Sequence, residues 1–182
     1  MTAHDQPVPL AERCLRIELL VLDVDGVLTD GSITYASDGA ELKTFHVRDG
    51  SGLKLWRQAG RQAAIITGRS SPVVERRAAE LGIGPLVQGA ADKSAALRNL
   101  LKECGLGPDQ ACYLGDDLPD LGAMLLCGLS AAVADACPEV RAAAHYVTAA
   151  AGGRGAAREV IELILRCQGH WQRLVERLRN EC

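Results

Sequence analysis

Short apolar runs recur along the chain, and each one ends at a turn or a polar segment. The first covers residues 17–22 and leads directly into Asp23 and a Gly-containing loop, which is typical of a fully buried strand. Further runs of the same kind lie at residues 62–67, 85–87, 111–114, 129–134 and 146–147. We therefore expect a buried sheet whose strands are spread over most of the sequence.

Segments with helical start and stop signals lie between these runs. One opens at Ser71-Pro72 and closes at Leu81-Gly82, and another opens at Asp92 and stops at Cys104-Gly105. This alternation predicts an α/β fold, a three-layer, Rossmann-like parallel sheet with helices on both faces. In such a fold the functional residues gather beyond the carboxyl ends of the strands.

Two segments depart from the alternation. Residues 32–47 read as two extended runs around Asp38-Gly39, a strong hairpin signal, and we call this predicted hairpin the flap. Residues 155–179 carry apolar positions at helical spacing with a break near Gly169. We therefore expect an N-terminal leader (1–16), one main domain (17–150), and a Gly-rich segment with a helical tail (151–182) that belongs to the same domain.

Composition and charge narrow the class of protein. The 182 residues are 48% hydrophobic and 24% charged, as in one globular domain, and the net charge of -3 argues against nucleic acid as a partner. The seven cysteines form no CxxC pair, so neither a zinc ribbon nor a disulfide framework is indicated. No apolar signal segment is present, and no apolar run approaches the ~18 residues of a membrane span. We expect a cytoplasmic protein without membrane contact.

Polar residues that are able to act in catalysis or in metal binding follow several of the predicted strands. They are Asp23, Asp25 and Gly26 after the first strand, Thr67, Gly68 and Arg69 after the second, Lys93 at a helix start, and Asp116, Asp117 and Asp120 after the fourth. Carboxylates in this number suit a hard divalent cation such as Mg²⁺ better than a thiolate-binding metal. Any one cluster alone is most often a solvated turn, and a lone lysine is most often a surface residue. Together they predict a site at one edge of the sheet.

The motifs DVDGVLT, TGR, a lone lysine and GDDLPD occur in this order. Because of these motifs and their order, the chain resembles the haloacid dehalogenase superfamily of aspartate-nucleophile phosphatases. Segments such as ITYASDGAELKTFHVRDGSGLKLW and GGRGAAREV are similar to the branch of that family without a cap domain. The resemblance covers roughly residues 17 to 166. It implies a Mg²⁺-dependent phosphatase that forms an aspartyl phosphate.

The resemblance also implies roles for individual residues. Asp23 would attack phosphorus, and Asp25 would protonate the leaving alkoxide and later deprotonate water. Asp23, the Asp25 carbonyl and Asp116 would hold Mg²⁺, and Lys93 would offset negative charge. Thr67 and the amides near Gly26 and Gly68 would bind phosphoryl oxygens. Of Asp117 and Asp120, one would contact the waters of the metal and the other would orient Lys93.

The resemblance implies that the substrate is an anionic sugar acid phosphate with eight carbons. Only 44 positions separate Asp23 from Thr67, which leaves no room for a cap. The resemblance implies instead a homotetramer in which neighbouring flaps and tails complete each site. Guanidinium groups recognise carboxylates in bidentate geometry, and Arg48, Arg69 and Arg154 are the arginines nearest the predicted mouth. For Arg154, a plain turn before a helix is the competing interpretation.

Other functions stay open at this point. The substrate could be the 9-phosphate of a nine-carbon keto-deoxy sugar acid, and the residue after Thr67-Gly68 is the position expected to differ between the two types. The chain could also be a non-catalytic oligomerising or binding module of the same family, although the complete set of motifs argues against it. A receiver domain would carry its acidic pair and its phosphorylated aspartate in a different order. A dehalogenase would need neither Asp25 nor a metal.

Overall fold

A six-stranded parallel sheet forms the centre of the protein in the computed structural model, which describes residues 8–180. The strand order is β5-β4-β1-β6-β7-β8, with β1 and β6 in the middle. The strands are β1 (Leu19–Leu22), β4 (Gln62–Ile66), β5 (Leu86–Val87), β6 (Ala111–Gly115), β7 (Leu129–Ala132) and β8 (Tyr146–Val147). Residues of β1 are buried on both faces, as the continuous apolar run predicts. The predicted α/β sheet is confirmed.

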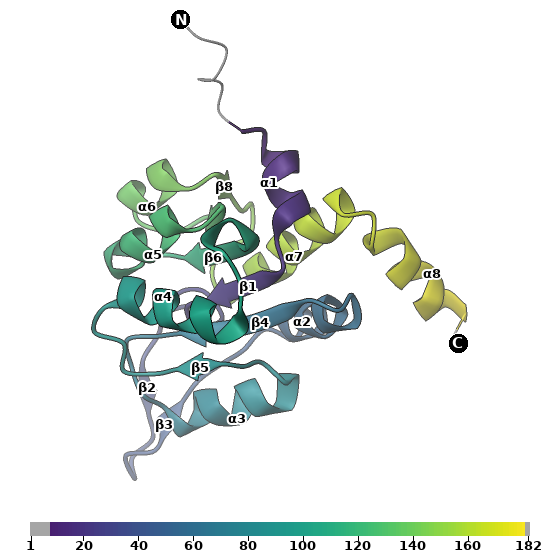
Figure 1. The fold of residues 1–182 in the computed structure, drawn as a ribbon. Helices are drawn as coiled ribbons and strands as arrows, with labels where there is room; N and C mark the ends of the chain where they lie inside the picture. Colours follow the sequence, from purple (N-terminus) through teal and green to yellow (C-terminus); the bar gives the residue numbers. More distant parts are fainter. Residues whose placement is uncertain (1–7, 181–182) are drawn as a thin grey trace, which may run out of the picture.

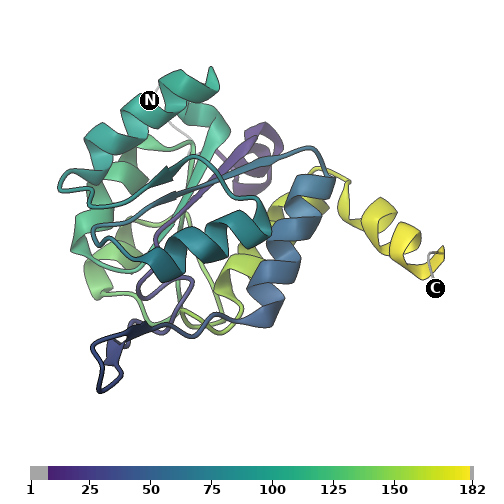
Figure 2. The same ribbon diagram turned by 90° about the horizontal axis from the view of Figure 1, so that it is seen from below.

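Helices cover both faces of this sheet (Figure 2). On one face α2 (Val47–Gln58) packs on α3 (Pro72–Leu81) and α7 (Ala156–Cys167). On the other face α4 (Lys93–Cys104) packs on α5 (Leu121–Leu126), which in turn packs on α6 (Pro138–Ala143). Two 3₁₀ turns, η1 (Pro108–Gln110) and η2 (Leu118–Asp120), flank β6. The structure therefore has the three predicted layers.

The ends of α3 and α4 lie where the sequence signals place them. Gly82 and Gly105 follow the two helices in the left-handed conformation, with φ of 61° and 67°. The side chain of Asp92 caps α4 by accepting a hydrogen bond from the Ala95 amide at 3.0 Å.

The N-terminal boundary differs from the prediction. Residues Leu10–Arg16, assigned to the leader, form helix α1 and pack on α7. Cys14 of this helix is fully buried, and Arg13 Nη1 donates to the Gly128 carbonyl at 2.6 Å. Ile17 ends α1, so the first strand begins two residues later, at Leu19. The apolar run alone does not separate a helix end from a strand start.

The flap is present as an antiparallel pair, β2 (Thr34–Tyr35) and β3 (Glu41–Leu42). Gly39 has a φ of 83° at its turn, and Asp38 Oδ1 accepts from the Ala40 amide at 3.0 Å. Its last predicted residue, Val47, instead begins α2. The hairpin extends from the carboxyl edge of the sheet (Figure 1).

The tail consists of α7 and α8 (Trp171–Asn180), with Gly169 at a φ of 72° between them. Helix α8 extends away from the body of the molecule (Figure 1). Trp171 is buried, and the guanidinium groups of Arg158 and Arg166 each lie 5.0 Å from its ring. The predicted break in the helical tail is confirmed. Among the described residues, the helices are too short or too polar to cross a bilayer.

Candidate active site

The carboxyl ends of three adjacent strands open into one pocket of about 440 Å³. Asp23 follows β1, Thr67 follows β4 and Asp116 follows β6, and these strands are neighbours in the sheet. The pocket is lined by Asp23, Asp25, Thr67, Gly68, Arg69, Ala90, Ala91, Lys93, Asp116, Asp117, Pro119 and Asp120. Parallel strands thus bring together motifs that lie far apart in the sequence.

Lys93 lies at the bottom of this pocket between two carboxylates. Its Nζ is 2.9 Å from Asp23 Oδ2 and 2.6 Å from Asp120 Oδ1, and the side chain is only 6% exposed. Burial lowers the pKa of Lys93, but the charges of Asp23 and Asp120 outweigh burial and raise it above its ordinary value. Lys93 is therefore a fixed cation beside Asp23.

Asp120 is held by four donors, which explains how Lys93 is oriented. Besides Lys93, the Tyr113 hydroxyl donates to Oδ1 at 2.9 Å, and the amides of Asp116 and Asp117 donate to Oδ2 at 3.0 and 3.3 Å. Of the two candidate residues, Asp120 and not Asp117 contacts Lys93. Tyr113 was missed by sequence reasoning, because a tyrosine inside an apolar strand carries no motif.

Asp23, Asp116 and Asp120 form a compact carboxylate cluster. Each offers one oxygen, and these oxygens lie within 4.8 Å of one another. Among residues 8–180, Asp23 Oδ1 has no hydrogen-bond partner although it is buried. Burial, helped by the charge of Asp120, raises the pKa of Asp23 to about 6 and that of Asp116 to about 7. Since the donors to Asp120 occupy both its oxygens, Asp23 and Asp116 are the members of this cluster that remain able to bind a hard divalent cation.

Gly26 leaves space for the carboxylate of Asp116. Its φ is 86°, and a Cβ at this position would lie 2.6 Å from Cγ of Asp116 and overlap its Oδ2. A side chain is therefore excluded by conformation and by space. Gly68 differs, because an added Cβ would approach only the Ala90 carbonyl, at 3.9 Å. Its lack of a side chain leaves the pocket wall open.

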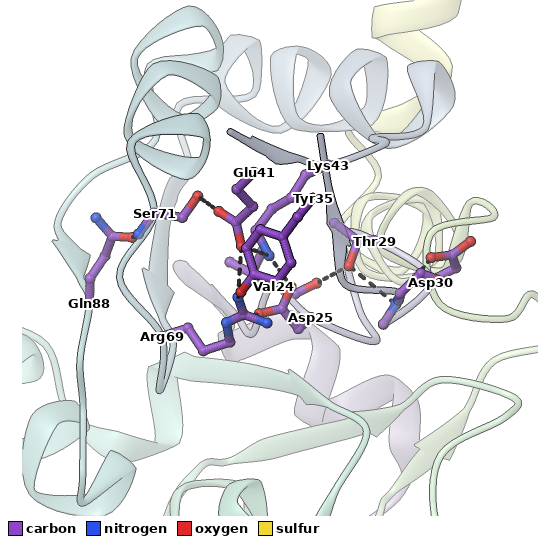
Figure 3. Close-up of polar contacts among 12 residues, drawn as sticks. Val24, Asp25, Thr29, Asp30, Tyr35, Glu41, Lys43, Arg69, Ser71 and Gln88 are labelled. Carbon is purple, nitrogen blue, oxygen red and sulfur yellow. Dashed lines mark hydrogen bonds and ion pairs between the residues drawn. The ribbon is translucent and has the colours of Figure 1, made fainter. Parts of the chain in front are cut away.

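Charged groups of the flap contact two residues that line this pocket, Asp25 and Arg69 (Figure 3). Lys43 Nζ forms an ion pair with Asp25 Oδ1, and Arg69 Nε lies 3.9 Å from Asp25 Oδ2. Glu41 accepts a hydrogen bond from Arg69 Nη2 at 2.8 Å and another from the Ser71 hydroxyl. Glu41 and Lys43 were missed by sequence reasoning. Their spacing of two residues, which places side chains on one face of an extended chain, was the available signal.

Arg48 and Arg154 lie outside the carboxylate pocket. They line a second cavity of about 680 Å³ together with Arg158, Arg166 and residues of α7. Arg154 is 67% exposed at its side chain and lies 3.7 Å from Asp30. Within one chain the structure brings Arg69, but neither of these two arginines, to the predicted substrate site.

The Gly-rich segment before α7 packs against the Asp23 loop. The Gly153 amide donates to the Val27 carbonyl at 2.9 Å, and a Cβ on Gly152 would lie 2.6 Å from the carbonyl carbon of Gly26. Backbone meets backbone here, so this segment supports the loop that carries Asp23 and Asp25.

A parallel sheet with a carboxylate cluster and a lysine at its carboxyl edge agrees with the class of haloacid dehalogenase-like hydrolases, and the family model of that description matches residues 83–160. The 3-deoxy-D-manno-octulosonate 8-phosphate phosphatase KdsC of Escherichia coli strain K12 is 50% identical over 84% of this chain and 81% of its own. The enzyme of the same name from Haemophilus influenzae is 43% identical over 88% and 89%. The chain belongs to the family of the 3-deoxy-D-manno-octulosonate 8-phosphate phosphatases.

Solved structures agree with this assignment. The phosphatase of this name from Moraxella catarrhalis, in complex with a magnesium ion, a phosphate ion and a KDO molecule, has a TM-score of 0.91 and 45% identity. The superposition covers 92% of this chain and 97% of that one. A probable phosphatase of the YrbI family from Pseudomonas syringae has a TM-score of 0.90 and 50% identity over 92% and 95%.

Proposed function

We propose that this chain hydrolyses 3-deoxy-D-manno-octulosonate 8-phosphate to the free sugar acid and inorganic phosphate. The observation that carries the proposal is the state of Asp23: its Oδ2 is held by Lys93 at 2.9 Å while its buried Oδ1 is free of described partners. A carboxylate with one fixed oxygen and one free oxygen is prepared for attack on phosphorus. The names of the relatives supply the substrate.

In the proposed first step, Asp23 Oδ1 forms a bond to phosphorus and the bond to the sugar oxygen breaks, which gives an aspartyl phosphate. Lys93, fixed by Asp120, offsets the negative charge that gathers beside Asp23. Thr67 and Gly68 line the pocket, and in the proposal the Thr67 side chain and the amides near Gly26 and Gly68 bind the phosphoryl oxygens. Water then cleaves the aspartyl phosphate and releases inorganic phosphate.

Asp25 is the proposed general acid and base. It gives a proton to the departing sugar oxygen and later takes one from the attacking water. Its two oxygens face Lys43 and Arg69, so the flap holds the carboxylate in place over the pocket. Asp25→Asn should therefore bind substrate but lose about 10²–10⁴-fold in rate.

Mg²⁺ is the proposed cofactor, held by Asp23, Asp116 and the backbone carbonyl of Asp25. When bound, it would offset the charge of the carboxylates and of a nonbridging phosphoryl oxygen, which makes phosphorus easier to attack. The raised pKa values of Asp23 and Asp116 support this, because crowded carboxylates of this kind favour a bound cation. One relative is described with magnesium and another, from Haemophilus influenzae, in a cobalt-bound form.

The sugar acid is proposed to meet Arg69 in the pocket, with Arg48 and Arg154 acting across a subunit boundary. Arg69 lines the pocket, whereas the other two line the second cavity. We also propose that the protein forms a homotetramer with shared sites, because the flap and the start of α2 expose apolar side chains, those of Ile33, Tyr35, Leu42 and Val47. The cytoplasm is its proposed location. Light scattering that shows a fully active monomer would contradict the shared site.

The decisive experiment compares sugar phosphates. Purified protein is incubated with Mg²⁺ and either the eight-carbon 8-phosphate or a nine-carbon keto-deoxy sugar acid 9-phosphate, and inorganic phosphate is measured. Higher kcat/KM on the eight-carbon substrate is expected, with no turnover by Asp23→Asn. Preference for the nine-carbon compound would favour the alternative substrate. A folded protein that turns over neither would favour a non-catalytic module.

A further inference from the structure

Glu41 of the flap connects three side chains around the pocket mouth (Figure 3). Its Oε1 accepts from Arg69 Nη2 at 2.8 Å and lies 3.5 Å from Lys43 Nζ, and its Oε2 accepts from the Ser71 hydroxyl. The Glu41 side chain is only 15% exposed. The hydrogen bond from Ser71 and the charges of Lys43 and Arg69 outweigh burial and lower the pKa of Glu41, which is therefore charged at neutral pH.

These contacts involve only some of the guanidinium nitrogens of Arg69. Nη2 donates to Glu41 and faces the Tyr35 hydroxyl at 3.5 Å, and Nε lies 3.9 Å from Asp25. Nη1 is buried and has no acceptor among the described residues. A buried guanidinium nitrogen without an acceptor is costly, and Arg69 lines the pocket with Asp23 and Asp25. One edge of the guanidinium is thus fixed, while Nη1 is left without a partner among the described residues.

The contact geometry separates two possible effects of Glu41. A carboxylate that competed with the substrate would take two nitrogens of Arg69 in bidentate fashion. Glu41 takes only one, because its other oxygen is bound to Ser71. It also places a negative charge between the cations Lys43 and Arg69, which would otherwise repel each other beside Asp25. This arrangement orients Arg69 and does not block it.

We propose that Glu41 is a positioning residue for substrate recognition: it holds Arg69 at the pocket so that the guanidinium group meets the sugar acid. This inference rests on the proposed function, in which Arg69 binds the sugar acid. Since Glu41 lies on the hairpin, it also makes recognition depend on the flap being seated against the loop after β4. The chemical step at Asp23 does not involve Glu41, so its removal should affect KM more than kcat.

The test measures kcat and KM for wild type, Glu41→Gln, Arg69→Ala and the double variant. The substrates are 3-deoxy-D-manno-octulosonate 8-phosphate and p-nitrophenyl phosphate, which lacks a sugar acid. Glu41→Gln should raise KM for the sugar acid phosphate about tenfold, with kcat and both constants for p-nitrophenyl phosphate within about twofold. In the Arg69→Ala background, Glu41→Gln should add less than about twofold.

Glu80→Gln is the matched control. Like Glu41, the Glu80 carboxylate accepts hydrogen bonds from arginine, here from Arg76 and Arg77, but it lies on α3 outside the pocket. Glu80→Gln should leave both substrates unchanged. If Glu41→Gln does not fold, Ser71→Ala replaces it, because this change frees Oε2 of Glu41 and should raise KM several-fold for the sugar acid phosphate alone.

The outcomes are distinguishable. A lower KM in Glu41→Gln would mean competition and overturn the proposal. Equal losses on both substrates, or full additivity with Arg69→Ala, would mean a purely structural role and overturn it as well. Wild-type protein that releases no phosphate from the sugar acid phosphate would overturn the proposed function and this inference together.

Discussion

Neutralising Asp116 should stabilise the metal-free protein even though it removes a proposed metal ligand. Burial, and then the charges of Asp120 and Asp23, raise the pKa of Asp116 from its ordinary value of 3.8 to about 7. The folded protein therefore binds this proton more tightly than the unfolded chain. Stability falls as pH rises from about 4 to about 7, and the full destabilisation is present above that range.

The magnitude follows from the same values. One pKa unit corresponds to about 1.4 kcal/mol, so a charged Asp116 costs at most about 4 kcal/mol of folding free energy. Because Asp116 is half-buried, solvent screening reduces this to about 2 kcal/mol. For a chain of this length, that corresponds to a rise of roughly 4–8 °C in Tm for Asp116→Asn.

Calorimetry at pH 8 in excess chelator measures the difference in Tm between Asp116→Asn and wild type. Asp117→Asn is the control, because Asp117 is the next residue in the sequence but is exposed. The gain from Asp116→Asn should shrink at pH 5, where the wild-type carboxyl is protonated. Added Mg²⁺ should raise the Tm of wild type and change Asp116→Asn much less. An Asp116→Asn protein that melts below wild type in chelator at pH 8 would refute the reasoning.

Three further variants test other parts of the site. Gly152→Ala should cost about 3 kcal/mol in unfolding free energy and lower kcat, because its Cβ would push against the Gly26 backbone; unchanged denaturation and kinetics would contradict the close packing. Asp49→Ala should cost about 2 kcal/mol, since the Asp49 carboxylate accepts from the Gly155 and Arg158 amides at 3.2 and 2.8 Å, and urea denaturation measures it. Arg154→Ala should weaken use of the sugar acid phosphate, leave p-nitrophenyl phosphate hydrolysis nearly unchanged and preserve the oligomer in light scattering; equal losses on both substrates would contradict its recognition role.

The part of the site that the sequence predicts is the part fixed by strand ends. Asp23, Thr67 and Asp116 each follow a short buried run, and parallel strands must end at one edge of the sheet. Lys93 joins them because its helix starts at the same edge. Arg48 and Arg154 follow no strand directly in this way, so their distance from the site could not be judged from spacing.

Helix α2 shows why other elements were missed. It contains Gly50 and Gly52, which lower helix propensity and hide the pattern. The structure gives the reason for Gly52: a Cβ there would lie 3.2 Å from the Cα of Arg158, so the glycine allows α2 and α7 to approach closely. Tertiary packing thus favours a residue that local propensity disfavours. The charges on the flap were missed for a related reason, since their partners lie on other elements.

The two groups of cations around the pocket differ in how firmly they are held. Lys93 is fixed by Asp120, which is itself tied to Tyr113 in the central strand β6 and to two backbone amides. Lys43 lies on the flap, and Arg69 is connected to the flap through Glu41. Groups that stabilise charge in a reaction must not move during it, whereas groups that select a substrate can change position as it enters. In the proposed function, the sheet therefore holds the charge-stabilising Lys93 rigidly, whereas the flap holds Arg69 for the choice of substrate. The flap also takes part in the proposed chemistry, because its Lys43 contacts Asp25.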